Sequence, residues 1–179
     1  MKLGMLLALT WASDMLWRAV AAVVTRPAIF RRLVQRAMRT PYTHITSADG
    51  TSVYMARYWL FNPYPGRDSY RRSGWREWMP SVRIHHIRRA DQDRHLHDHP
   101  WNARTIVCRG WYYETRGEHS LHCRDVGYTG RLLFGEYHRI VAVPSEGVWT
   151  IFITWRYQGT WGFLVDGHKV PWREYLGVE

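Results

Sequence analysis

The sequence predicts an all-β fold: one antiparallel β-barrel or sandwich, preceded by one or two N-terminal α-helices. Beyond Pro41, short strand-like runs rich in β-branched and aromatic residues follow one another, and turn-forming residues separate them without an intervening helical stretch. Before Pro41, the apolar residues follow a helical period instead. A chain of 179 residues is long enough for one domain. We divide it into a helical segment, 1–40, and a β-barrel, 41–179.

The first helix is predicted over the apolar stretch from Leu3 to Val24, which only Asp14 and Arg18 interrupt with charge. A membrane span requires roughly 20 apolar residues, so the stretch nearly qualifies as one. A short secretory signal behind Lys2 fits the same residues, and so does a helix that packs on the domain or lies at a membrane interface. We favour packing on the domain.

A second helix is predicted after Pro27, where apolar side chains recur at helical spacing and arginines cover the opposite face. The apolar residues are Ile29, Phe30, Leu33, Val34 and Met38, and the arginines are Arg31, Arg32, Arg36 and Arg39. This pattern suits a helix docked on a barrel or attached to anionic lipid, and we prefer docking. Because two free thiols are typical of a reducing compartment, Cys108 and Cys123 favour a cytoplasmic location. Membrane association through residues 3–24 is the alternative.

Seven strand-like runs follow, and they are expected at 51–61, 81–89, 103–114, 131–134, 138–143, 148–157 and 161–165. The turns between them are marked by Asp49-Gly50, Gly117, Gly127, Gly130, Pro144 with Gly147, Gly159 and Asp166-Gly167. Residues 62–80 contain three prolines and two glycines, so they are predicted to form a long surface excursion.

The charge of the chain indicates an anionic partner. The formal net charge is +10, the pI is about 10.1, and arginine supplies all but two of the 25 basic residues. The planar donor fork of arginine suits carboxylates and phosphates, so a small anionic substrate, nucleic acid or an anionic membrane face is expected. Arginines and aromatic residues interleave over 66–78, a pattern able to bind single-stranded nucleic acid. A solvated loop is the preferred interpretation of that segment.

A cluster of histidines is the most specific functional signal in the sequence. Five fall within 85–99, and His95, His97 and His99 alternate. In an extended backbone, residues two apart point to the same side, about 7 Å apart. Two such imidazoles can converge on one divalent ion, to which nitrogen bonds at about 2 Å. We therefore expect a metal site with ligands His97 and His99. His138, which opens a later strand-like run, is the preferred third ligand, and His86 is the next candidate.

The segment "LHDHPWNARTIVCRGWYYE" (96–114), together with His138, resembles the two short metal motifs of the cupin superfamily. In cupins an HxH pair leads into a strand that ends at a turn glycine, here Gly110, and a third histidine comes from a later strand of the same barrel. The resemblance implies a cupin-like jelly-roll barrel in which His97, His99 and His138 hold one divalent metal ion.

Within that superfamily the chain is similar to small, mostly uncharacterised phage and bacterial proteins. The similarity covers about Arg26 to Leu176. It rests on "RYWLF" (57–61), "LHDHPW" (96–101), "HRI" (138–140), "WGF" (161–163) and "PWREYL" (171–176).

The sequence departs from many cupins at one ligand position. Those cupins place a glutamate three to four residues past the HxH pair, where this chain has Ala103 and Arg104. The resulting three-histidine site is similar to that of cupins resembling thiol dioxygenases, which implies Fe(II), with Zn, Mn or Ni as alternatives. Three neutral ligands leave the ion's +2 charge uncompensated, so an anionic substrate would bind it favourably.

We expect Arg104, one of three arginines near the ligands in sequence, to hold the carboxylate of the substrate. The other two are Arg94 and Arg139. Tyr112 is the expected proton donor or acceptor. The alternation of side chains along a strand does not by itself show whether Tyr112, Tyr113 or Glu114 faces the barrel interior.

The leading function is therefore oxidation of a small anionic substrate by a non-haem Fe(II) oxygenase, with isomerase or lyase chemistry at another metal also open. The alternatives are a non-catalytic cupin module, such as a virion or host-interaction protein with a structural metal, and a basic nucleic-acid binder.

Several other residues receive structural interpretations. Asp98 or Asp93 could accept a second ring proton from a histidine, but a turn or cap role is preferred for both. Trp101, Trp149 and Trp161 are expected in the core. The set Cys108, His119, His122 and Cys123 matches no usual zinc spacing and is disfavoured.

Overall fold

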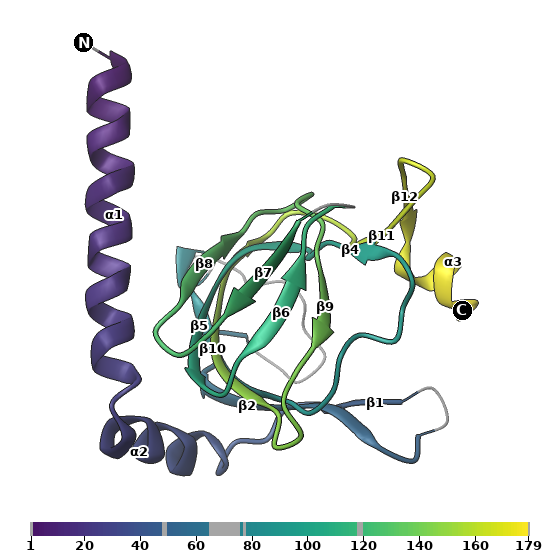
Figure 1. Ribbon diagram of the computed structural model, residues 1–179, viewed down its shortest axis with the longest axis horizontal. Helices are drawn as coiled ribbons and strands as arrows, with labels where there is room; N and C mark the ends of the chain where they lie inside the picture. The colour runs from purple at the N-terminus through teal and green to yellow at the C-terminus, as the bar shows by residue number, and fades with distance from the viewer. Residues whose placement is uncertain (1, 48–49, 65–75, 77, 118–119, 179) are drawn as a thin grey trace.

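The structure is a computed structural model, and it describes residues 2–47, 50–64, 76, 78–117 and 120–178 (Figure 1). For residues 2–12 it describes the backbone. Two long helices open the chain: α1 (Lys2–Val24) and α2 (Pro27–Ala37). Twelve described strands follow, and a short helix, α3 (Trp172–Leu176), comes near the end of the chain. The strands are β1 (Ile45–Thr46), β2 (Val53–Phe61), β3 (Ser81–Ile87), β4 (Leu96–His97), β5 (Trp101–Arg109), β6 (Tyr112–Thr115), β7 (Leu121–Arg124), β8 (Thr129–Leu132), β9 (Arg139–Ala142), β10 (Val148–Tyr157), β11 (Gly162–Val165) and β12 (His168–Pro171).

The strands form an antiparallel barrel. Its larger wall is a six-stranded sheet in the order β1-β2-β3-β10-β5-β8, and the facing wall is the sheet β7-β6-β9. Figure 1 shows the smaller sheet in front of the larger one. One apolar cluster joins the two walls across the interior, because its members come from β3, β5, β6, β9 and β10. They are Ile87, Val107, Tyr112, Ile140 and Val148. The predicted all-β architecture is thus present.

Strand β10 shows how the larger wall is buried on both faces. Its residues alternate between the barrel interior, as with Phe152, and the outer face, as with Ile151 and Ile153. The outer residues belong to a second apolar cluster that includes Ala21 of α1 and Phe30 of α2. The two helices therefore form the outer cover of this sheet.

Both helices dock through aromatic contacts. The ring of Trp17 in α1 meets Trp155 edge-on at 6.2 Å, and Phe30 in α2 meets Trp149 at 6.3 Å. Met38 at the end of α2 was expected on the apolar face but is exposed. Among the described residues, no helix combines the length and hydropathy that crossing a membrane requires.

Most of the predicted strands are present, with shifted boundaries. The run 103–114 is divided into β5 and β6 at Gly110, which has φ +77°. A Cβ at this residue would lie 2.7 Å from the carbonyl oxygen of Gly147, so only glycine fits. The sequence did not predict β1, β4, β7 and β12, and each of these has only two to four residues. Asp49 of the predicted Asp49-Gly50 turn lies outside the described residues.

The ends of the two smaller sheets meet at His97 and His138. β4 pairs with β11 in the sheet β12-β11-β4. His97 also forms a backbone bridge with His138, in which each residue donates its N–H to the other's carbonyl oxygen at 2.9 Å. This bridge brings residues 41 positions apart in the chain into direct register.

Candidate metal centre

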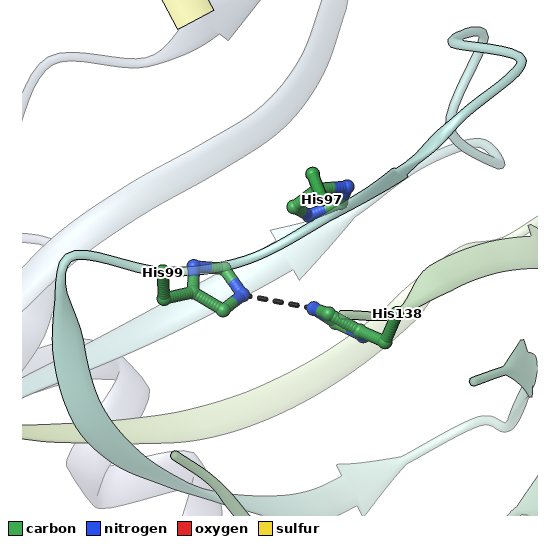
Figure 2. Close-up of side chains that lie close together, drawn as sticks. All are labelled: His97, His99 and His138. Carbon is green, nitrogen blue, oxygen red and sulfur yellow. Dashed lines mark hydrogen bonds between the residues drawn. The ribbon is translucent and has the colours of Figure 1, made fainter. Parts of the chain in front are cut away.

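The three predicted ligands lie together. One nitrogen from each of His97, His99 and His138 falls within 4.8 Å of the others. The Nε2 atoms of His99 and His138 are 2.8 Å apart, so one ring donates a hydrogen bond to the other, as Figure 2 shows. The ring centroids of His97 and His138 are 4.8 Å apart. The period-two spacing of His97 and His99 does place their side chains on one side of the chain.

Burial keeps the imidazoles of His97 and His99 neutral. It lowers the pKa of His97 to about 4, an effect that nearby His138 reinforces. Burial also lowers the pKa of His99 well below its ordinary value, with the neighbouring His138 and His97 acting in the same direction. The side chain of His97 still keeps 16% exposure. Neutral rings with available lone pairs are the form that binds a divalent cation.

Glu114 stands behind His138. Its Oε1 atom lies 3.0 Å from Nδ1 of His138, at hydrogen-bond distance although not well aligned for one. Burial raises the pKa of Glu114, but His138, Arg116 and Arg124 together outweigh that effect and hold the pKa at about 2. A carboxylate at Nδ1 turns Nε2 toward the other two rings, as partners of metal-bound histidines do.

Asp91 occupies the matching position behind His97. Its Oδ2 atom is 3.9 Å from Nδ1 of His97, and it accepts a hydrogen bond from the backbone N–H of Ile140 at 2.8 Å. The hydroxyl of Tyr54 donates to Oδ1 of Asp91. Asp91 therefore fixes its loop to β9 and places a negative charge near Nδ1 of His97, without a hydrogen bond to the ring.

Asp98 points away from the three rings and serves the fold. It is fully buried, accepts the backbone N–H of Gly162 at 2.8 Å, and binds Lys169 at 2.6 Å. Because residues two apart share a side and Asp98 falls between the ligands, its carboxylate reaches β11 and β12 on the other side.

Arg104 does not join the histidines. It lies on the outer face of β5, where it donates to Asp14 of α1 at 3.1 Å and to Thr129 at 3.2 Å. Its guanidinium also lies 5.0 Å from the ring centroid of Trp17. The structure thus gives Arg104 a contact with α1 rather than with a substrate at the three rings.

Arg83 is a guanidinium that lies inside the barrel. It is almost fully buried on β3 and donates to Oγ1 of Thr154 at 3.0 Å. Its positive charge contributes to the lowered pKa of His99. Arg139, another sequence candidate, instead donates to the backbone carbonyl oxygens of Asp93 and Arg94.

Tyr112 faces the interior but lies in the apolar cluster. Burial raises its pKa well above the ordinary value, and the negative charge of Glu114 adds to the effect. Tyr112 and Glu114 share a face of β6, whereas Tyr113 points outward. Of these three residues, Glu114 is the one in contact with a predicted ligand.

The other histidines divide between the surface and the interior. His95 shares a hydrogen bond of 2.9 Å with the hydroxyl of Tyr175, and His86 stacks on Trp149 outside the barrel. His85 is buried inside and stacks on Phe152. The sequence did not predict His85, Asp91 and Arg83 as site residues. Residues two apart in β3 share a face, so Arg83 and His85 point to the same side. This alternation is the sequence signal that could have identified them.

The cysteine–histidine set and the arginine-rich segment form no site in the part of the chain that the structure describes. Cys108 is buried in the cluster beneath the helices, Cys123 is exposed, and His119 lies outside the described residues. Most of the segment 66–78, the candidate for nucleic acid, also lies outside them.

No protein-family model and no curated protein matches the chain. Solved structures do. A cupin-like protein from Thermotoga maritima is 17% identical over 77% of this chain and 93% of its own, with a TM-score of 0.47. A cupin-2 domain from Rhodospirillum rubrum is 10% identical over 69% of this chain and 74% of its own, with a TM-score of 0.49.

A DMSP lyase from Ruegeria pomeroyi is 13% identical over 73% of this chain and 57% of its own, with a TM-score of 0.45. The barrel described above follows from the strand pairing of this chain itself. What the barrel can do chemically depends on its histidine site.

Proposed function

We propose that this chain is a mononuclear metal protein of the cupin type. His97, His99 and His138 bind one divalent ion, and the protein oxidises a small anionic substrate there, with Fe(II) as the favoured metal. The observation that carries the proposal is the convergence of one nitrogen from each of the three rings within 4.8 Å. Bound Fe(II) would supply a site at which substrate and oxygen react.

The donor set fits such an ion. Two nitrogens that share an ion at bonds of about 2 Å lie close to 3 Å apart. The Nε2 atoms of His99 and His138 already have this spacing, at 2.8 Å, and the nitrogen of His97 lies within 4.8 Å of them. Glu114 at Nδ1 of His138 and Asp91 toward Nδ1 of His97 leave the Nε2 atoms for the metal. Imidazole ligands suit Fe, Zn, Cu and Ni, which is why the metal must be measured.

An anionic substrate is supported by charge. The ligand set carries no formal charge of its own, so a bound divalent ion would keep its +2 charge. Inside the barrel, Arg83 adds another positive charge that acts on His99. Together they favour a small carboxylate over a neutral or cationic substrate.

Elemental analysis tests the metal. Protein purified without added metal is expected to contain about one equivalent of iron, and the variant His97→Ala/His99→Ala is expected to contain none. His95→Ala is the matched control, because His95 belongs to the same cluster but bonds Tyr175 instead. Equal metal content in the double variant and the control would refute the site.

Oxygen uptake tests the chemistry. Fe(II)-loaded protein is expected to consume oxygen when small carboxylates are supplied, and the His97→Ala/His99→Ala variant is not. Stoichiometric zinc without iron, and no oxygen uptake with any small anion, would contradict the oxygenase.

A structural metal is the second candidate function. It is favoured by the backbone bridge between His97 and His138, because an ion at this point would cross-link two sheets of the barrel. Unfolding of the His97→Ala/His99→Ala variant would support this function over the catalytic one.

A further inference from the structure

The barrel interior contains a fourth imidazole that the proposed metal site does not use. His85 on β3 is only 7% exposed. Its Nε2 atom is buried and makes no hydrogen bond within the described part of the chain. Leaving a buried polar atom without a partner is costly, so this atom favours a ligand that accepts or donates a hydrogen bond there.

His85 faces the metal side of the barrel. The adjacent residues Ile84 and His86 face outward, Ile84 beneath the helices and His86 against Trp149. The ring of His85 stacks on Phe152 with centroids 5.0 Å apart, and the ring of His99 lies 5.5 Å from the same Phe152 centroid. Phe152 is therefore the shared neighbour of His85 and a metal ligand.

His85 is close to the ion site without belonging to it. The nitrogens that gather within 4.8 Å of one another come from three other histidines, and His85 is not among them. A side chain that shares Phe152 with a ligand but is not itself a ligand can contact a molecule bound to the ion.

We propose that Nε2 of His85 donates a hydrogen bond to a small anion bound at an open position of the ion held by His97, His99 and His138. The inference rests on the proposed metal function and adds the residue that recognises the ligand. The class of ligand is a carboxylate or similar small anion, in which one atom binds the metal and a neighbouring atom accepts the hydrogen bond.

Two features of the interior suit His85 to this role. Burial and the charge of Arg83 lower the pKa of His85, so at neutral pH the ring is uncharged and carries a single N–H. Arg83 comes from the same face of β3 and adds positive charge beside it.

Azide binding to the Co(II)-loaded protein tests the inference, because azide is a small anion whose coordination changes the visible spectrum of Co(II). His85→Ala is expected to bind one equivalent of Co(II) like the unmodified protein but to bind azide about tenfold more weakly, the scale of one hydrogen bond to a charged group. His85→Gln keeps an N–H donor and is expected to recover part of the affinity.

His86→Ala is the matched control, since it removes the adjacent imidazole from the outer face and is expected to leave azide binding unchanged. If His85→Ala does not fold, His85→Leu takes its place, because leucine fills the site without donating a hydrogen bond.

The possible results separate the two proposals. Failure of the unmodified protein to bind Co(II) at the three histidines overturns the metal function and the role of His85 with it. The other result overturns the role of His85 alone. It is normal Co(II) binding by His85→Ala, or by His85→Leu, together with the azide affinity of the unmodified protein.

Discussion

At the scale of single residues, Glu114 is the carboxylate placed to orient a ligand ring, that of His138. Glu114 is almost fully buried, yet it stays ionised because two arginines and His138 surround it. Removing a carboxylate of this kind releases both the orientation and the tautomer of the ring in front of it.

Replacement of Glu114 by glutamine is expected to weaken metal binding about 10- to 100-fold, the usual effect of losing such a partner. The measurement is a competition titration with a metal chelator. Glu136→Gln is the control, because Glu136 is exposed and also lies near Arg116, at 3.5 Å. Unchanged affinity in Glu114→Gln would show that Glu114 does not orient His138.

The two cysteines are expected to differ sharply in reactivity. Burial raises the pKa of Cys108 to about 12, whereas Cys123 is exposed. Because the thiolate is the reactive form, a thiol reagent at pH 8 should modify one cysteine in the folded protein and both after denaturation.

The variant Cys123→Ser provides the control and should show no reactive thiol until it unfolds. The raised pKa also means that the unfolded state loses the Cys108 proton first, above pH 9, so stability should fall between pH 9 and pH 12. Rapid modification of folded Cys123→Ser would contradict the burial of Cys108.

At the scale of secondary-structure elements, one ion pair holds β4 in place. Asp98 lies directly after β4 and binds Lys169 of β12 as well as the N–H of Gly162 in β11. Only two lysines occur in the chain, and this one secures the strand that carries His97. The geometry of the ligands thus depends on a contact made behind them.

The two partners of this ion pair are expected to be unequal. Lys169→Met leaves the fully buried carboxylate of Asp98 without its cation and should cost about 3 kcal/mol or more. Asp98→Asn leaves Lys169, whose side chain is 29% exposed and can be hydrated, so its cost should be smaller. Denaturant unfolding of both variants measures the difference, and an equal or reversed order would contradict the dominant role of the buried carboxylate.

At the scale of the whole molecule, the histidines couple the sheets of the barrel. His97 belongs to the sheet β12-β11-β4, and His138 stands next to β9 in the facing sheet. A ligand that binds only the folded state stabilises it by mass action. An ion at this junction would therefore stabilise the barrel as a unit.

Metal at one hundred times its dissociation constant is expected to add about 2.7 kcal/mol to the free energy of unfolding. Thermal unfolding with and without a chelator measures the effect as a change in Tm. His95→Ala should keep the metal-dependent shift and His97→Ala/His99→Ala should lose it. A shift that persists in the double variant would place the metal elsewhere.

The sequence by itself determined the alternation of His97 and His99 and the strand-like runs, because each depends on local backbone geometry. It also indicated His138, which opens a later run, whereas the turn at Gly110 was implied by a resemblance. Tertiary structure alone decided which face of each strand is the inside. β5 is buried on both faces, by the helices outside and the barrel within, so Arg104 and Thr105 are equally buried although they point in opposite directions.

For the same reason, the alternation of residues along a strand could not show that Arg83 faces the interior, and it could not choose Glu114 over Tyr112. Period two tells which residues share a face, and only the packing of the two helices against the sheet tells which face looks toward the histidines.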